Sequence, residues 1–123
     1  MRKKKHFDTS TFNDQNRSFL YGNSQTQMEQ INAVNAHNMG YFGQGVRVLY
    51  IDTGFNLEHE AFDSLQVISQ YDFINNDNET ANETEEEFQN NQDEHGSLCL
   101  SVLSGFKEGQ LIGPAFKSEF LLA

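Results

Sequence analysis

The feature that most constrains the fold is the short apolar run at residues 46–51, which ends abruptly in Asp52-Thr53-Gly54. The run is rich in β-branched residues and follows the glycine turn GYFGQG, so it predicts a short β-strand. An ionisable carboxylate directly after a buried strand is costly unless another group pairs with it. The rest of the chain is therefore expected to supply a partner for Asp52.

The remaining pattern predicts further strands and helices around this run. Apolar residues at spacings near three and four, from Met28 to Met39, predict an amphipathic helix that ends at Gly40. A second strand is predicted at 65–73, a small-residue helix at 95–105 and the opening of another strand in SEFLLA. Strands that alternate with helices are typical of a parallel α/β sheet, whose ligand sites lie beyond the carboxyl ends of the strands. Asp52 lies at such an end.

Charge and composition vary along the chain and set its expected organisation. Residues 1–22 are polar and lack periodicity, which predicts a flexible N-terminal arm before a domain at 23–123. A contact of the basic start MRKKKH with nucleic acid or a surface is the alternative to a solvated terminus. The segment at about 74–94 is acidic and rich in amides, and it is expected to form a surface loop because it has little apolar surface to bury.

Net charge and the distribution of apolar residues argue against nucleic-acid binding, a membrane span and a secretion signal. Eight basic and 18 acidic residues give a net charge of −10, which argues against general nucleic-acid binding. No stretch approaches the roughly 20 apolar residues that cross a bilayer. The basic start is not followed by the apolar segment of a secretion signal.

Two candidate site residues stand on different predicted elements. Asp52 follows a strand, and taken alone it could simply cap the next turn. His95 opens the helix at 95–105 with Gly96 and Ser97, and taken alone it could be a capping or surface histidine. A carboxylate and an imidazole brought together would instead form an acid–base pair.

Together the two elements carry a resemblance to a known family. The stretches GVRVLYIDTGFNLEHEAF, HGSLCLSVLSG and LIGPAFKSEFLLA, in this order, resemble the subtilases, the subtilisin-like serine peptidases. The family pattern is a strand ending in Asp-[Ser/Thr]-Gly, a short loop with His, then His-Gly-[Thr/Ser] and a Gly-x-Ala-Pro turn. The resemblance covers residues 30–123 and departs from the pattern at Phe116, which stands where the turn has its proline. It implies a three-layer α/β/α fold with a mainly parallel sheet, here incomplete.

The resemblance also implies a function. Asp52 corresponds to the catalytic acid and His95 to the general base of an Asp-His-Ser triad, in a serine endopeptidase that works through an acyl-enzyme. The chain order of the subtilisin triad is Asp, His, Ser, so the nucleophilic serine is expected after the last residue of this chain. Ser97, Ser101 and Ser104 are not credible nucleophiles, because they lie on or beside the predicted helix. This chain alone is therefore expected to be an inactive N-terminal portion of a peptidase domain.

No metal site is assigned from the sequence. Ala61 stands where some bacterial members of the family carry a calcium-binding Asp, so that site is not carried over. Carboxylates of the acidic segment suit hard cations, but they lack EF-hand spacing. A structural Ca²⁺ ion therefore stays open and no cofactor is certain. Cys99, at a position where some subtilases also have a cysteine, is interpreted as a small buried side chain behind His95.

The implied partner is a peptide or protein substrate, with no nucleic acid and no membrane segment. The resemblance implies that the full-length protein is secreted, although this sequence does not itself give a location. The alternative function is a non-catalytic pseudo-peptidase or binding module, whose acidic loop binds cations or a basic partner. The two alternatives differ in whether a serine nucleophile accompanies Asp52 and His95.

Overall fold

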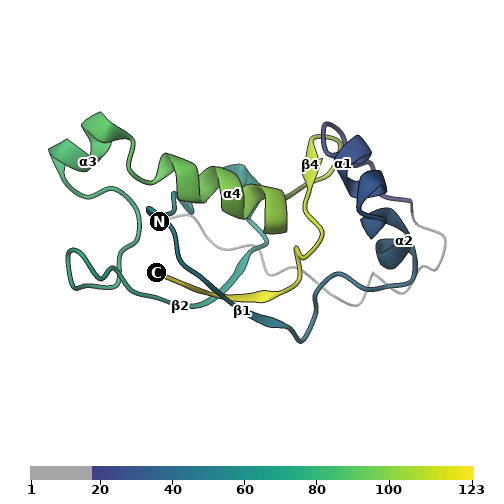
Figure 1. Cartoon of the computed structure of the whole chain (residues 1–123), viewed down its shortest axis with the longest axis horizontal. Coiled ribbons are helices and arrows are strands. Elements are labelled where there is room, and N and C mark those ends of the chain that lie inside the picture. Colours follow the sequence, from purple (N-terminus) through teal and green to yellow (C-terminus); the bar gives the residue numbers. More distant parts are fainter. Residues whose placement is uncertain (1–17) are drawn as a thin grey trace.

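A computed structural model describes residues 18–123 of the chain as a mixed α/β structure (Figure 1). In chain order the elements are α1 (Gln25–Gln30), α2 (Ala33–Asn38), β1 (Arg47–Tyr50), the 3₁₀ turn η2 (Glu60–Phe62), β2 (Gln66–Gln70), α3 (Glu85–Asn90), α4 (Glu94–Ser104), β3 (Phe106–Lys107), β4 (Leu111–Ile112) and β5 (Glu119–Leu122). None of the helices in this part of the chain is long and apolar enough to cross a membrane.

The main sheet has three parallel strands in the order β1-β5-β2. The last strand of the chain, β5, lies in the middle and pairs with both neighbours, so that Leu121 faces Leu49 of β1 and Ser69 of β2. The register shifts between Val67 and Ser69 of β2. The strands predicted at 46–51, at 65–73 and in SEFLLA are thus confirmed, together with their parallel direction.

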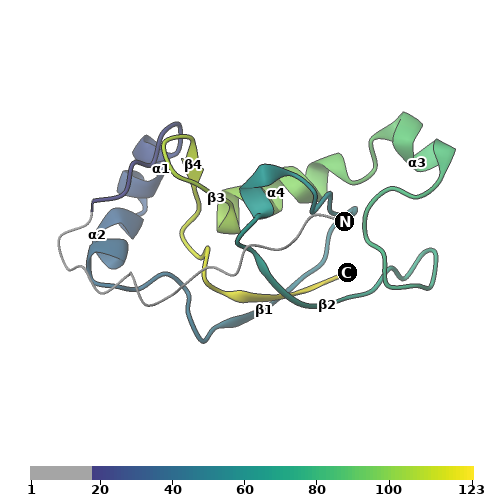
Figure 2. The same cartoon turned by 180° about the vertical axis from the view of Figure 1, so that it is seen from behind.

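Helix α4 covers one face of this sheet, as both cartoon views show (Figures 1 and 2). Its Leu100 packs with Phe55, Phe62, Phe120 and Leu122 in a buried cluster that joins the helix to the strands. This cluster holds α4 in place above the sheet, because alternate residues of β5 point into it. On the strands, Leu49 and Ile68 and the adjoining Ile51 are exposed.

A second core joins the N-terminal helices to the short β3–β4 hairpin. Its buried members are Phe19, Tyr21, Met28, Ala33, Phe42, Ile112 and Phe116. Because Phe19 and Tyr21 retain only 6% and 2% of their exposure, the folded part begins before the arm boundary predicted at residue 22. The rest of the predicted arm, residues 1–17 with their basic start, lies outside the described residues. The β3–β4 hairpin was not predicted, since each strand has only two residues.

Two other predictions were wrong in detail. The single helix expected up to Gly40 is two short helices, because Asn32 between them adopts a left-handed conformation with φ of 61°. The acidic segment expected to be a loop contains α3. Thr84 and Glu87 form a capping box there, in which each side chain accepts from the backbone N–H of the other residue, and this satisfies donors at the helix start.

Candidate active site

The site lies where strand β1 ends and helix α4 begins. One residue, Ile51, separates Asp52 from the end of β1, and His95 is the second residue of α4. The backbone N–H of Asp52 donates to the carbonyl of Ala123 at 3.0 Å, which ties it to the residue just after β5. Asp52 therefore sits at the carboxyl edge of the parallel sheet, the edge where α/β proteins bind their ligands.

Two glycines let α4 approach the loop after Asp52. A Cβ atom on Gly96 would collide with the carbonyl oxygen of Gly54 and would lie 3.1 Å from the Cβ of Asp52. Gly54 has a φ of 135°, a conformation that side chains rarely adopt. The backbone N–H of Gly96 donates to the hydroxyl of Thr53 at 3.3 Å. The motifs Asp-Thr-Gly and His-Gly are thus two halves of one close backbone contact.

This contact brings Asp52 and His95 together. The Oδ1 atom of Asp52 lies 2.7 Å from the Nδ1 atom of His95. A carboxylate only accepts hydrogen bonds, so Nδ1 carries the proton and donates it. In the neutral ring this leaves a lone pair on Nε2, which can take a proton from another group. The side chain of Asp52 is 14% exposed and that of His95 is 69% exposed, so the imidazole faces outward from a nearly buried carboxylate.

The protonation of Asp52 reflects two opposed effects. Burial favours the neutral acid and acts to raise the pKa of Asp52. Hydrogen bonds from His95 and from the backbone N–H of Thr53, the latter at 2.7 Å, together outweigh burial and hold the pKa below its usual value. The carboxylate is therefore charged at neutral pH. The cost of placing a carboxylate after the strand is offset by these partners.

Cys99 and Tyr50 border the Asp52–His95 pair. Cys99 lies one helical turn after His95, with its Sγ atom 3.7 Å from Nε2 and 3.9 Å from Nδ1 of the imidazole. Tyr50 of β1 is partly buried, and burial, followed by the nearby Cys99 and Asp52, raises the pKa of its hydroxyl. Cys99 is only partly buried, so it borders the site rather than filling a core behind it.

The serine hydroxyls near His95 are hydrogen-bonded to backbone groups of α4 and of the adjoining loops. The hydroxyl of Ser97 accepts from the backbone N–H of Asn56 at 2.7 Å and donates to the carbonyl of Asp93 at 2.6 Å. Ser101 and Ser104 donate to carbonyls of the preceding helical turn. Within residues 18–123, no serine hydroxyl is hydrogen-bonded to the imidazole of His95.

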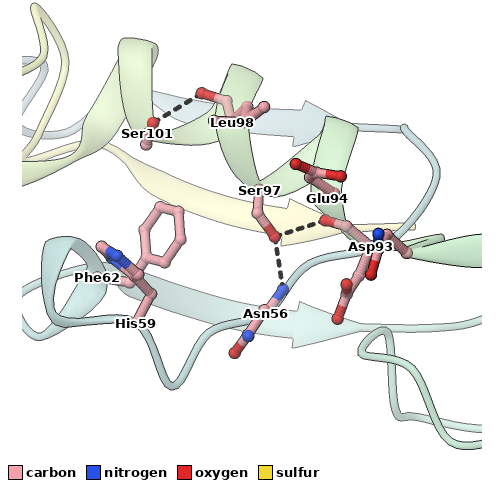
Figure 3. Close-up of a pocket in the computed structure, with 9 residues that line it drawn as sticks. Asn56, His59, Phe62, Asp93, Glu94, Ser97, Leu98 and Ser101 are labelled. Carbon is pink, nitrogen blue, oxygen red and sulfur yellow. Dashed lines mark hydrogen bonds between the residues drawn. The ribbon is translucent and has the colours of Figure 1, made fainter. Parts of the chain in front are cut away.

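A separate pocket of about 330 Å³ adjoins the start of α4 (Figure 3). Its lining is formed by Asn56, His59, Phe62, Asn91, Asp93, Glu94, Ser97, Leu98 and Ser101. Figure 3 shows the Ser97 hydroxyl bridging Asn56 and Asp93 at its wall. Nδ1 of His59 accepts from the backbone N–H of Ala61 at 3.2 Å, which caps η2. Neither Asp52 nor His95 is part of this lining.

The acidic segment uses several of its carboxylates internally. Asp93 accepts from the backbone and side-chain N–H groups of Asn82, at 3.2 and 3.0 Å. Glu87 accepts from Asn75 and from the backbone of Glu83 and Thr84. Among residues 18–123, the group of three metal-ligating side chains that lie close together is Asp52, His95 and Cys99, not a cluster in the acidic segment.

No family model matches this chain, and no curated protein has a significantly similar sequence.

Sequence reasoning paired Asp52 with His95 but missed two neighbours. Thr53 binds both Asp52 and Gly96, which the Asp-Thr-Gly motif could have indicated. Tyr50 belongs to the strand before Asp52, and the alternation of side chains along a strand places residues 50 and 52 on the same face.

Proposed function

We propose that residues 23–123 form the N-terminal portion of a subtilisin-like serine endopeptidase domain, with Asp52 as the acid and His95 as the base of its triad. One observation carries this function: Oδ1 of Asp52 lies 2.7 Å from Nδ1 of His95, and the two residues come from motifs of the subtilase pattern. The parallel sheet and the covering helix α4 support a subtilisin-like, three-layer α/β/α arrangement as the finer fold assignment.

The chemistry assigned to this pair is proton transfer. A serine hydroxyl is a poor nucleophile at neutral pH, so Nε2 of His95 takes its proton as the oxygen attacks the scissile carbonyl. The same proton then passes from the imidazolium to the leaving amine. Water later attacks the acyl group and gives a proton to Nε2, which returns it to the serine oxygen as that oxygen leaves. Asp52 keeps Nδ1 protonated and stabilises the imidazolium, which requires the charged carboxylate found here.

The pair is accessible for this role. The side chain of His95 is 69% exposed, which leaves room for a substrate and a serine to approach the imidazole. That serine has to come from a segment outside residues 18–123. The net charge of −10 favours basic peptides over acidic ones through the field of the protein.

The test uses the longest protein that the reading frame encodes. An in-frame Gly-[Thr/Ser]-Ser-[Met/Ala] motif downstream of residue 123, labelling by a fluorophosphonate probe and cleavage of a casein substrate are the expected results. Asp52→Asn should lower turnover by about 10⁴-fold, because the wrong imidazole tautomer is then favoured. Asp63→Asn, which changes an exposed carboxylate outside the site, is the matched control.

Two results would reject this function. One is a protein with the motif that neither reacts with the probe nor cleaves casein. The other is a reading frame that stops without such a motif, which would favour the non-catalytic binding module. In that case a basic peptide should bind the chain, and neutralising Glu85 and Glu86 should weaken the binding.

A further inference from the structure

The side chains of Asp52, His95 and Cys99 form a cluster that the proposed proton transfer uses only in part. One carboxylate oxygen, one imidazole nitrogen and the cysteine sulfur can be chosen so that all three atoms lie within 4.8 Å of one another. His95 and Cys99 are four residues apart on α4, a spacing that places two side chains on the same helix face. Asp52 reaches the same place from the end of β1.

The sulfur–nitrogen distances within the cluster are close to those around a tetrahedral ion, whereas the oxygen–nitrogen distance is shorter. Zinc binds sulfur at about 2.3 Å and nitrogen or oxygen at about 2.0 Å, so its ligand atoms stand about 3.3 to 3.6 Å apart. Sγ of Cys99 lies 3.7 Å from Nε2 and 3.9 Å from Nδ1 of His95, close to this range. The 2.7 Å between Nδ1 and Oδ1 of Asp52 must widen by about 0.6 Å, which the exposed ring of His95 has room to allow.

The ligand types also select the ion. Thiolate and imidazole ligands suit Zn²⁺, whereas Ca²⁺ and Mg²⁺ prefer oxygen ligands only. Three protein ligands leave the fourth position to water, as in zinc sites that stay open. We propose that Asp52, His95 and Cys99 bind one Zn²⁺ ion. This site stands on geometry alone and does not depend on the peptidase assignment.

The proposed site has a consequence if the peptidase assignment also holds. When Nδ1 of His95 binds the metal, the proton that it donates to Asp52 has to move to Nε2, and Asp52 no longer orients the ring. Zinc would then compete with proton transfer and inhibit the enzyme. The thiol of Cys99 gives up its proton when the metal binds, because the thiolate is the ligand.

The experiment titrates the purified 123-residue chain with Zn²⁺ and with Co²⁺, a tetrahedral stand-in whose bond to thiolate absorbs in the near ultraviolet. We expect one tightly bound ion in the presence of excess Ca²⁺, and a thiolate–cobalt band. Because Cys99 is the chain's one cysteine, the band has a single assignment. Cys99→Ser should abolish the band and weaken zinc binding by about tenfold or more, and His95→Ala should weaken it similarly.

Glu94→Gln is the matched control, since it removes an exposed carboxylate next to His95 on the same helix and should leave binding unchanged. Amide NMR spectra of each variant establish that it is folded. Three results would overturn the site: no zinc binding, zinc displaced by Ca²⁺, or the same affinity in folded Cys99→Ser. Displacement by Ca²⁺ would place the metal on carboxylates, and an unchanged affinity in Cys99→Ser would place it on other ligands of the chain. Loss of peptidase activity in the longer protein would not affect the outcome.

Discussion

Asp52 and His95, 43 residues apart in the sequence, are joined by a hydrogen bond of 2.7 Å across the boundary between β1 and α4. The bond fixes which imidazole nitrogen carries the proton, and together with the backbone N–H of Thr53 it holds the pKa of Asp52 below its usual value despite burial. It explains why the chain keeps an acid immediately after an apolar strand. The same contact defines the residues whose substitution is most informative.

The imidazole tautomer of His95 is the first testable consequence. Asp52→Ala removes the acceptor for Nδ1–H, so the population of the Nδ1-protonated ring should fall markedly in favour of the Nε2-protonated form. Long-range proton–nitrogen NMR distinguishes the two forms at a pH where the ring is neutral. Asp63→Ala, in an exposed position, should leave the tautomer unchanged. An unchanged tautomer in Asp52→Ala would show that the bond does not orient the ring.

Gly96→Ala tests the close approach of α4 to the Asp52 loop. In an ordinary helix, alanine in place of glycine stabilises by up to about 1 kcal/mol. Here the added methyl group meets the carbonyl of Gly54, so the free energy of unfolding should fall by about 1–3 kcal/mol instead. Urea denaturation followed by circular dichroism measures the change. Because an ordinary helix would be stabilised by this substitution, a loss of stability is evidence for the close contact between Gly96 and Gly54.

Val102→Ala serves as the control for the Gly96 variant. Val102 lies on the same helix and is 67% exposed, so its substitution should change the free energy of unfolding by less than about 0.5 kcal/mol. A Gly96→Ala protein that is as stable as the original would mean that α4 does not need to approach Gly54 so closely.

Much of the site was predictable because its motifs are local. The apolar run before Asp52 predicts a strand, and the small residues after His95 predict a helix. The family resemblance then pairs Asp52 with His95. The strands of the main sheet could be predicted for the same reason. The strand order of this sheet could not be predicted, because the central position of β5 depends on pairing between segments far apart in the chain.

The errors have identifiable physical causes. Helix α3 was missed although Thr84 and Glu87 carry the capping-box spacing, because the acidic composition outweighed that signal. The break between α1 and α2 depends on one left-handed residue, Asn32, which a hydrophobic period does not reveal. Phe19 and Tyr21 lie in a polar stretch and gain their burial from partners far along the chain.

The second core contains a buried polar pair that gives another prediction. His37 is 3% exposed, and its Nε2 lies 2.9 Å from the carbonyl of Pro114 while its Nδ1 lies 2.8 Å from the hydroxyl of Tyr21. Nε2 must donate to the carbonyl, so Nδ1 accepts from Tyr21. Burial lowers the pKa of His37, in spite of the bond to Pro114, and keeps the ring neutral.

Tyr21→Phe leaves Nδ1 of His37 buried without a donor. The free energy of unfolding should therefore fall by about 1–3 kcal/mol, the cost of an unsatisfied buried acceptor. Tyr41→Phe is the matched control, because Tyr41 is 63% exposed and should tolerate the loss of its hydroxyl. Urea denaturation of both variants measures the difference. Equal stabilities for the two variants would mean that the Tyr21–His37 hydrogen bond contributes nothing.

Glu87 predicts how the stability of α3 depends on pH. Hydrogen bonds to its carboxylate, from Asn75 and then from the backbone of Glu83 and Thr84, lower the pKa of Glu87 to about 2. Because this value lies below that of the unfolded chain, the stabilisation is complete above the unfolded pKa of about 4.5 and is lost as the pH falls toward 2. Glu87→Gln should therefore lower the urea midpoint at about pH 6. At about pH 3 the difference in urea midpoint between the variant and the original protein should be smaller. Glu86→Gln, an exposed change on the same helix, should show a smaller gap. A Glu87→Gln gap that stays constant with pH would mean that the charged carboxylate does not hold this segment together.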